Sequence, residues 1–219
     1  MKNKLKTLAA LASLTLSTNA AVVGIDVIDD GNGIATTTGV LDTTSRTWST
    51  VGTASLDGID DLTITVSGAT DSGTGNRNPA LTLFKDYQYT VGGTINVTIS
   101  GLNDLKNYNL AVFMGQWYVS SGSTSFLRGG EATVTTANTT HPSAESTTGD
   151  SFDTYLEGVN YVQFDNLTTD GSGNINFTVS NGPEGIGIFN GFEIQSVPEP
   201  SSSAMLGLGG LALILYRRK

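Results

Sequence analysis

The stretch at residues 25–33, with the sequence IDVIDDGNG, gathers residue types that could bind a metal ion. Its oxygen donors are Asp26, Asp29, Asp30 and Asn32. Such side chains are the ligands that Ca²⁺ prefers, and the neighbouring glycines would let backbone carbonyls turn inward. The stretch lacks the final Glu of an EF-hand loop, and Asp or Asn beside Gly is equally typical of a turn. Calcium is therefore a hypothesis for this stretch, and the sequence predicts no other cofactor.

Sugar recognition needs an exposed aromatic ring with polar neighbours, because sugar faces stack on rings while sugar hydroxyls form hydrogen bonds. Trp117 and Tyr118 fit this description, since a Gly/Ser-rich stretch at 120–125 follows them and Arg128 could donate. Trp48 is the next candidate. For either tryptophan the alternative is packing in the core. Trp117, Tyr118 and Arg128 thus form a hypothetical glycan-binding site.

The chain has few residues that could catalyse a reaction. The chain has no Cys and one His, His141, which lies in a Thr/Ser-rich stretch beside a Pro, so a nucleophilic triad or a zinc site lacks its usual residues. A glycoside hydrolase needs only two carboxylates about 5–10 Å apart. Asp153, Glu157 and Glu184 are candidates, but their spacing does not single them out. We predict no catalytic residue and a protein that is not an enzyme, with a carbohydrate-active hydrolase as the alternative.

The elements that would position these residues are β-strands. The segments 61–67 (DLTITVS), 94–100 (TINVTIS) and 174–180 (NINFTVS) alternate apolar and polar residues. Alternation with a period of two predicts antiparallel strands with one buried face and one solvent-exposed face. The segment 108–114 (YNLAVFM) is apolar on both faces and should be a central strand.

Further strands are expected at 161–164 and 186–194, and residues 170–173 are typical of a turn. Asn190 and Gly191 could make a tight hairpin, but we favour a bulge within one closing strand, because the apolar residues on either side then share a face. No convincing helix is expected between the two ends of the chain. About nine to eleven short strands are more than one open sheet usually holds. The expected fold class is all-β, an antiparallel β-sandwich of jelly-roll type.

Both ends of the chain indicate export. Residues 1–20 combine Lys2, Lys4 and Lys6 with an apolar stretch and end in small residues, which is typical of a helical signal peptide that signal peptidase removes. A short buried helix is the alternative. At the other end, residues 204–216 are nearly all apolar, and a basic cluster follows them. As a short hydrophobic helix this stretch spans roughly 20 Å against the ~30 Å hydrocarbon core, so it predicts a marginal anchor in the inner membrane.

The C-terminal residues also resemble a known sorting signal. They comprise a Pro-Glu-Pro motif and a terminal basic cluster, joined by a Ser linker and the apolar stretch: Val197, Pro198, Glu199, Pro200, Arg217 and Arg218. This order resembles the PEP-CTERM sorting signal of exopolysaccharide-producing Gram-negative bacteria. The resemblance implies that an exosortase-type membrane peptidase cuts near the Pro-Glu-Pro motif and passes the protein, after transient inner-membrane anchoring, to the cell surface or extracellular matrix. A simple C-terminal membrane anchor is the alternative.

The chain is therefore expected to contain one folded body between two processing signals. The expected domains are a signal peptide, one β-sandwich domain and the sorting signal, at residues 1–20, 21–196 and 197–219. Within the body, the stretches 101–115, 161–180 and 186–194 look like those of galactose-binding-like jelly-roll domains found ahead of PEP-CTERM tails. That resemblance rests on strand and turn motifs, and a fold by itself says little about a ligand.

Composition narrows the classes of partner. Charged residues make up 14% of the chain, and the net charge is −9. Without Glu199 and the six terminal Lys and Arg residues, 19 acidic and five basic side chains remain, a net charge of −14. This argues against nucleic acid, whose phosphates need a basic patch. The sequence predicts an exported, non-catalytic surface or matrix protein, structural or glycan-binding, with extracellular polysaccharide as a partner. A calcium-dependent adhesin is a further alternative.

Overall fold

The structure, a computed structural model, describes these parts of the chain: residues 20–28, 36–37, 39–41, 46–50, 52–56, 59–74, 82–119, 125–136, 139–146 and 154–198. The chain falls into two units, the body at residues 21–197 and a unit made of Met1–Ala20 and Pro198–Lys219. The expected signal helix and C-terminal helix lie outside the described residues. None of the helical structure within the described ranges has the length and apolar content of a membrane span.

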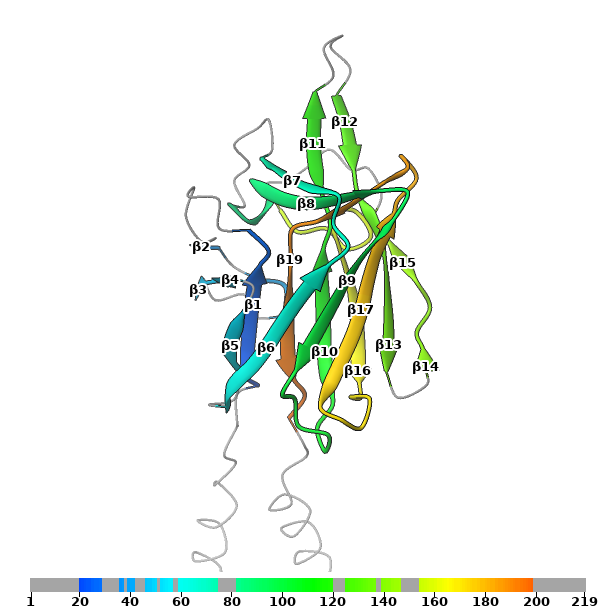
Figure 1. The fold of residues 1–219 in the computed structure, drawn as a ribbon. Coiled ribbons are helices and arrows are strands. Elements are labelled where there is room, and N and C mark those ends of the chain that lie inside the picture. Colours follow the sequence, from blue (N-terminus) through cyan, green and yellow to red (C-terminus); the bar gives the residue numbers. More distant parts are fainter. Residues whose placement is uncertain are drawn as a thin grey trace, which may run out of the picture. The chain divides into compact units, whose positions relative to one another are not determined.

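The strands with the clearest alternation lie side by side in a seven-stranded antiparallel sheet (Figure 1). Its order is β14 (Thr139–Thr140), β13 (Gly130–Thr136), β17 (Asn174–Asn181), β9 (Thr94–Ser100), β6 (Ile59–Ser67) and β5 (Thr53–Leu56), with β15 (Ala144–Glu145) also paired to β13. Along β9 and β17 each apolar residue is buried and each polar neighbour is more exposed. The prediction of strands with one buried face is confirmed.

A five-stranded sheet forms the second layer. Its order is β16 (Tyr161–Leu167), β10 (Tyr108–Phe113), β19 (Gly191–Ser196), β1 (Val22–Asp26) and β4 (Ser49–Thr50). All neighbours are antiparallel except β1 and β4, which are parallel. β10 lies between two strands and buries residues on both faces, so the prediction of a central strand is confirmed.

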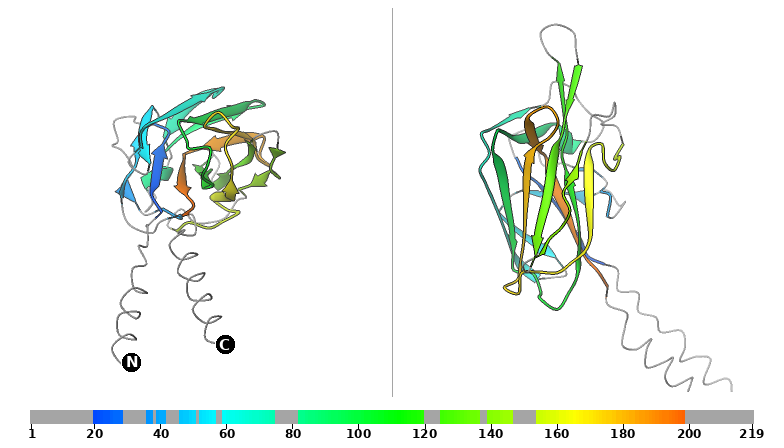
Figure 2. Two further views of the ribbon diagram at one scale, coloured as in Figure 1. Left: turned by 90° about the horizontal axis from the view of Figure 1, so that it is seen from below. Right: turned by 90° about the vertical axis from the view of Figure 1, so that its right-hand side faces the viewer.

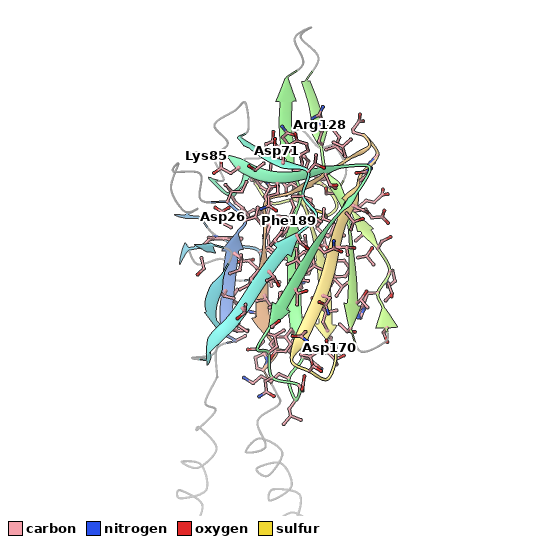
Figure 3. The ribbon with its side chains drawn as sticks, viewed as in Figure 1. Asp26, Asp71, Lys85, Arg128, Asp170 and Phe189 are labelled. Atoms are coloured by element: carbon pink, nitrogen blue, oxygen red, sulfur yellow. The ribbon has the colours of Figure 1, made fainter. Side chains whose placement is uncertain are left out.

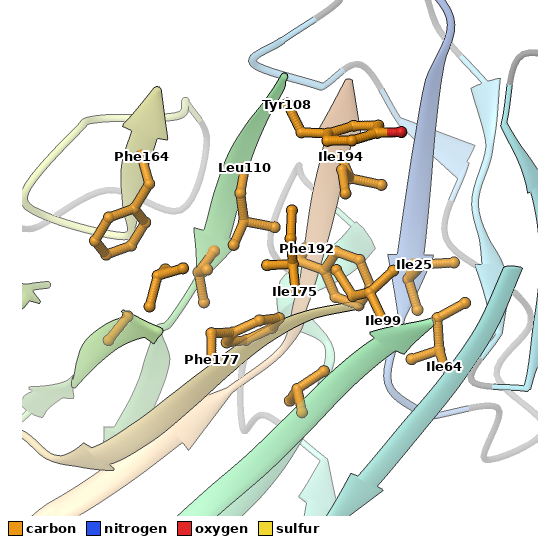
Figure 4. Packing of buried hydrophobic residues seen from close by; sticks show 14 of the residues in the cluster. Ile25, Ile64, Ile99, Tyr108, Leu110, Phe164, Ile175, Phe177, Phe192 and Ile194 are labelled. Carbon is orange, nitrogen blue, oxygen red and sulfur yellow. The ribbon is translucent and has the colours of Figure 1, made fainter. Parts of the chain in front are cut away.

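The main core lies between these two sheets (Figure 4). Ile64, Ile99 and Phe177 come from the seven-stranded sheet, and Leu110 and Phe192 come from the five-stranded sheet. The rings of Phe177 and Phe192 meet edge to face, with centroids 5.5 Å apart. The body is therefore an all-β, antiparallel sandwich, as the sequence predicts.

Smaller elements lie at one end of the sandwich and beside β1 (Figures 1 and 2). They are a three-stranded sheet of β7 (Asp71–Thr74), β8 (Asp86–Val91) and β18 (Ile186–Phe189), a hairpin of β11 (Gln116–Val119) and β12 (Ser125–Arg128), the pair β2 (Thr36–Thr37) and β3 (Arg46–Thr47), and the 3-10 helix η1 (Thr82–Phe84). The hairpin projects beyond the strands of both large sheets (Figures 1 and 2).

The predicted bulge at Asn190 and Gly191 is wrong, because the chain changes sheets there. β18 pairs with β8, whereas β19 pairs with β1 and β10. Asn190 stabilises the crossing: its side-chain Oδ1 accepts the N–H of Gly115 at 2.7 Å, and its Nδ2 donates to the carbonyl of Asp86 at 2.8 Å. A Cβ on Gly191 would lie 2.3 Å from the carbonyl oxygen of Ile25, so a side chain there would disturb the pairing with β1.

A smaller cluster covers the outer face of the five-stranded sheet. Phe113 is at its centre, and its ring centroid lies 5.1 Å from that of Tyr155, 5.3 Å from that of Trp48 and 5.8 Å from that of Tyr161. Ala111 on the same strand joins this cluster. The five-stranded sheet is therefore covered on both faces, which explains why β10 is apolar along its whole length.

A buried carboxylate also lies on this outer face. Glu193 in β19 is fully buried, and its Oε2 accepts the backbone N–H groups of Val40 at 2.7 Å and Leu41 at 3.0 Å. Gly39 lies directly against the carboxylate, since a Cβ there would be 1.6 Å from Oε1. Glu193 thus holds residues 39–41 against the sheet.

Candidate functional site

The projecting hairpin carries all three residues of the hypothetical glycan site, Trp117 and Tyr118 on β11 and Arg128 on β12. β11 and β12 form a two-stranded sheet of their own, whose register places Trp117 opposite Leu127 and Tyr118 opposite Phe126. Residues directly opposite each other in an antiparallel pair share a face. The register therefore places positions 117 and 127 on one face of the hairpin and positions 118 and 126 on the other.

Hydrogen bonds hold both strands of the hairpin at its base. On the β11 side, the N–H of Gly115 donates to the buried Asn190 side chain. On the β12 side, Ser146 is buried, its Oγ accepts the N–H of Gly130 at 3.0 Å, and it donates to the carbonyl of Met114 at 2.9 Å. Because rigid elements position a binding site more accurately than free loops do, this base suits a site on the hairpin.

Gln116 and Arg128 form the first cross-strand pair of the hairpin. Gln116 is buried, and its Nε2 donates to the hydroxyl of Tyr87 on β8. Arg128 is partly exposed, and it lies toward the end of the body from which the hairpin projects (Figure 3). The structure therefore brings Arg128 to the base of the element that carries Trp117 and Tyr118.

Trp48, the second tryptophan considered for sugar stacking, is in the core. It is 1% exposed, and its ring packs edge to face on Phe113. Gly24 on β1 makes room for it, since a Cβ there would lie 2.6 Å from the indole. A ring with both faces covered cannot stack on a sugar, so the core alternative for Trp48 is confirmed.

Two of the three carboxylates considered for a hydrolase lie in the described part of the chain. Glu157 and Glu184 are exposed and lie in separate turns, and Asp153 is outside the described residues. Burial raises the pKa of Tyr161, and the nearby carboxylate of Glu157 raises this pKa further. The ring of His141 lies 3.1 Å from the hydroxyl of Thr136. The hydrolase alternative stays a hypothesis.

The calcium hypothesis stays a prediction. Asp26 ends β1 and is buried, and its Oδ1 accepts the N–H of Ile28 at 3.3 Å. Asp29, Asp30 and Asn32 lie outside the described residues. Within the described ranges, no three His, Cys, Asp or Glu side chains are grouped so that they could hold a metal ion.

The predicted turn at 170–173 is confirmed, and two aspartates stabilise it. Asp170 accepts the N–H groups of Ser172 at 2.8 Å and Asn174 at 3.1 Å, as well as the Asn174 side-chain amide at 3.0 Å. Asp104 accepts the N–H of Gly173 at 2.8 Å and the hydroxyl of Thr169. This turn lies at the opposite end of the body from the hairpin (Figure 3).

These hydrogen bonds predict a small acid sensitivity. The side-chain amide of Asn174, and then the N–H of Ser172, hold the pKa of Asp170 below its usual value of 3.8. A lowered pKa stabilises the fold above the ordinary value, and this contribution disappears as the pH falls below 3.8. We expect the thermal midpoint to fall less between pH 5 and pH 2 in Asp170→Asn than in the parent chain, because Asn keeps the turn but does not titrate. An equal fall in both would contradict this assignment.

The folded body ends at the start of the sorting motif. β1 and β19 pair with Val22 opposite Gln195, so both ends of the body lie side by side. The N–H of Val197 donates to the carbonyl of Asn107 at 2.8 Å, and Pro198 is exposed. Four further motif residues lie outside the described part: Glu199, Pro200, Arg217 and Arg218.

Comparison with known proteins supports the sorting signal. Residues 196–219 match the family model of the PEP-CTERM protein-sorting motif, which confirms that prediction. No curated protein matches the chain. Among solved structures, the body is weakly similar to the enzymatically active domain of tailspike protein 4 of bacteriophage CBA120, with 17% identity and a TM-score of 0.30. The match covers 61% of this chain and 18% of the tailspike chain. The motif supports an exported protein that an exosortase sorts to the cell surface or extracellular space.

Proposed function

We propose that this protein is a non-catalytic component of the cell surface or extracellular matrix, and that it binds glycan through the β11–β12 hairpin. The observation that carries the proposal is the hairpin itself, which projects from the sandwich with Trp117 and Tyr118 on a base that hydrogen bonds hold. The match to the PEP-CTERM motif supports the location in which such binding would be useful.

The proposed route follows from the two ends of the chain. Signal peptidase would remove residues 1–20, and the C-terminal segment would anchor the protein briefly in the inner membrane until an exosortase-type peptidase cuts near Pro198. We further propose that the sandwich is of jelly-roll type and that it resembles galactose-binding-like domains. The ligand class that the protein would then meet is the extracellular polysaccharide of the organism that produces it.

The proposed chemistry combines stacking with hydrogen bonding. The face of a pyranose ring carries C–H groups that pack on an aromatic ring, whereas its hydroxyls need polar partners. Neighbouring positions of a strand face opposite sides, so Trp117 and Tyr118 would each supply a ring to a different face of the hairpin. Arg128 pairs with Gln116 and therefore shares the face of Tyr118, where it would donate to hydroxyl oxygens. A hairpin held at its base would lose little conformational entropy on binding, so more of the contact energy would appear as affinity.

We expect the variant Trp117→Ala/Tyr118→Ala to bind the extracellular polysaccharide of the producing organism at least about tenfold more weakly than the parent chain. The packing of a sugar on an aromatic ring and the burial of that ring each contribute on the order of 1 kcal/mol or more. Retardation of the full chain in native gels cast with that polysaccharide measures the dissociation constant. The control is Leu105→Ala, which truncates a residue that is 84% exposed and lies in the 101–107 loop.

Two results would contradict the proposal. If the double variant and the parent are retarded equally, the hairpin is not the glycan contact. If the parent chain releases reducing sugar from the polysaccharide, the hydrolase alternative gains support instead. Thermal unfolding of each variant checks that lost binding does not come from lost folding.

A further inference from the structure

The outer face of the seven-stranded sheet has an unusual uniformity. At one edge of this face, Glu131 on β13 lies directly opposite Ser180 on β17 and Glu145 on β15. Most other outward positions of four adjacent strands are occupied by Thr, Ser or Asn. On β6, β9, β17 and β13 these residues are Thr63, Thr65, Ser67, Thr94, Asn96, Thr98, Ser100, Asn174, Asn176, Thr178, Ser180, Thr133 and Thr135. We call this set the Thr/Asn face. It is uncharged although the whole chain has a net charge of −9.

The strand register turns this face into ordered rows. One row runs through Thr65, Thr98, Asn176, Thr135 and Thr140, each directly opposite the next across five strands. Neighbouring strands are about 4.8 Å apart, and successive outward residues on one strand are about 6.8 Å apart. Hydroxyl and amide groups are therefore repeated in two directions over the sheet.

The side chains of the face are also restrained. Thr is branched at Cβ and has few χ1 rotamers in a strand, so its hydroxyl loses little freedom when a ligand binds. The Thr98 hydroxyl donates to the Asn176 side-chain oxygen at 2.8 Å across the strands. The face is thus closer to a fixed set of donors and acceptors than a surface of long charged side chains would be.

The chemistry of the face selects among partners. It offers little apolar area, so a second protein would gain little from burying it. None of its own residues is cationic or acidic, so the face itself attracts neither an anionic nor a cationic polymer. Its acidic neighbours, Glu131 and Glu145, lie along one edge. The right-handed twist of a sheet, about 20–25° between neighbouring strands, opposes a match to a rigid crystalline surface but not to a flexible chain. A neutral polymer rich in hydroxyl groups meets all these conditions.

We propose that the Thr/Asn face is a second glycan-contact surface, which binds uncharged polysaccharide chains through many weak hydrogen bonds. The inference rests on the proposed glycan-binding role but assigns a different site from the hairpin. Many weak contacts along one polymer combine into a useful affinity, because each later contact forms at high effective concentration. The hairpin would select a sugar, and the face would hold the length of the chain.

The test removes hydroxyls without changing side-chain shape. In the full chain, Thr65→Val/Thr98→Val/Thr135→Val keeps three β-branched residues on the face. The control is Thr139→Val, because Thr139 is exposed but pairs with Thr136, whose side chain faces the core. The probes are native gels cast with dextran, a mannan, a β-glucan or the host's own extracellular polysaccharide, and with a polyuronate as the acidic comparison.

We expect at least one neutral polysaccharide to retard the parent chain and the polyuronate not to retard it. The triple variant should bind that neutral polysaccharide at least about tenfold more weakly. The control variant, Thr139→Val, should bind it like the parent. Equal binding by the triple variant and the parent, equal loss in the control, or no retardation by any neutral probe would overturn the proposal. If binding is lost only in Trp117→Ala/Tyr118→Ala, the hairpin binds glycan and the Thr/Asn face does not. If binding is lost only in the triple variant, the Thr/Asn face binds glycan and the hairpin does not.

Discussion

Trp48→Ala is expected to lower the free energy of unfolding by about 3–5 kcal/mol, the usual cost of removing a large aromatic side chain from a core. Trp48 is 1% exposed and packs edge to face on Phe113, at the centre of the cluster that covers the five-stranded sheet. The glycine at position 24 leaves room for the indole, so its removal creates a cavity between β1 and this cluster. Urea unfolding of the parent and variant measures the difference.

Trp48→Phe is the matched control. Within the described residues the indole Nε1 of Trp48 is buried without a hydrogen-bond partner, and Phe removes that polar group while it keeps an aromatic ring. We expect Phe to cost at most about half as much as Ala, because a smaller cavity remains. A loss below about 1 kcal/mol in Trp48→Ala would indicate a surface position and would contradict the core assignment. Glycan binding should not change in Trp48→Phe.

Glu193→Ala is expected to lower the free energy of unfolding by about 2–4 kcal/mol, because it removes the acceptor of two backbone N–H groups in a buried position. These groups belong to Val40 and Leu41, and the side chain of Gln195 also donates to the carbonyl of Leu41 at 3.3 Å. Glu193 itself is fully buried on β19. Truncation should therefore release residues 39–41 as well as destabilise the sheet.

Glu193→Gln separates the charge from the shape. The amide oxygen can still accept hydrogen bonds from Val40 and Leu41, but the second oxygen is replaced by an amide N–H, so we expect a smaller loss of about 1–2 kcal/mol. Chemical denaturation gives both values, and hydrogen exchange at the amides of Val40 and Leu41 reports the local effect. If those two amides exchange no faster in Glu193→Ala than in the parent, the carboxylate does not hold the segment.

Many strands of the sandwich and one of its turns could be predicted from the pattern of neighbouring residues in the sequence. The alternation in 94–100 and 174–180 predicts both the strands and their buried faces, because in a strand successive side chains point to opposite sides whatever the partner strand is. The Asp and Gly residues at 170–173 predict the turn for a similarly local reason. The sorting signal at the C-terminal end is likewise a linear motif, and the family match at residues 196–219 confirms it.

The candidate site depended more on tertiary structure. The sequence ranks Trp117 before Trp48 as a platform but leaves core packing open for both, and the packing of Trp48 on Phe113 shows that Trp48 is in the core. Thr65, Thr98 and Asn176 lie in one row on the Thr/Asn face, but they come from three strands that are distant in the chain. Only the strand order in the folded sheet shows that they are neighbours. A repeated Thr pattern indicates an exposed face, but not which other strands extend it.

The sequence alone therefore establishes which residues alternate, where turns form and which signal ends the chain, because each of these properties is set by neighbours within a few positions. The tertiary structure decides that the chain crosses between sheets at Asn190 and that Glu193 binds a segment more than 150 positions earlier. A hydrogen bond of this kind depends on two groups that meet only after the sheets have packed. No local spacing encodes such a meeting, because the distance along the chain does not determine the distance in space.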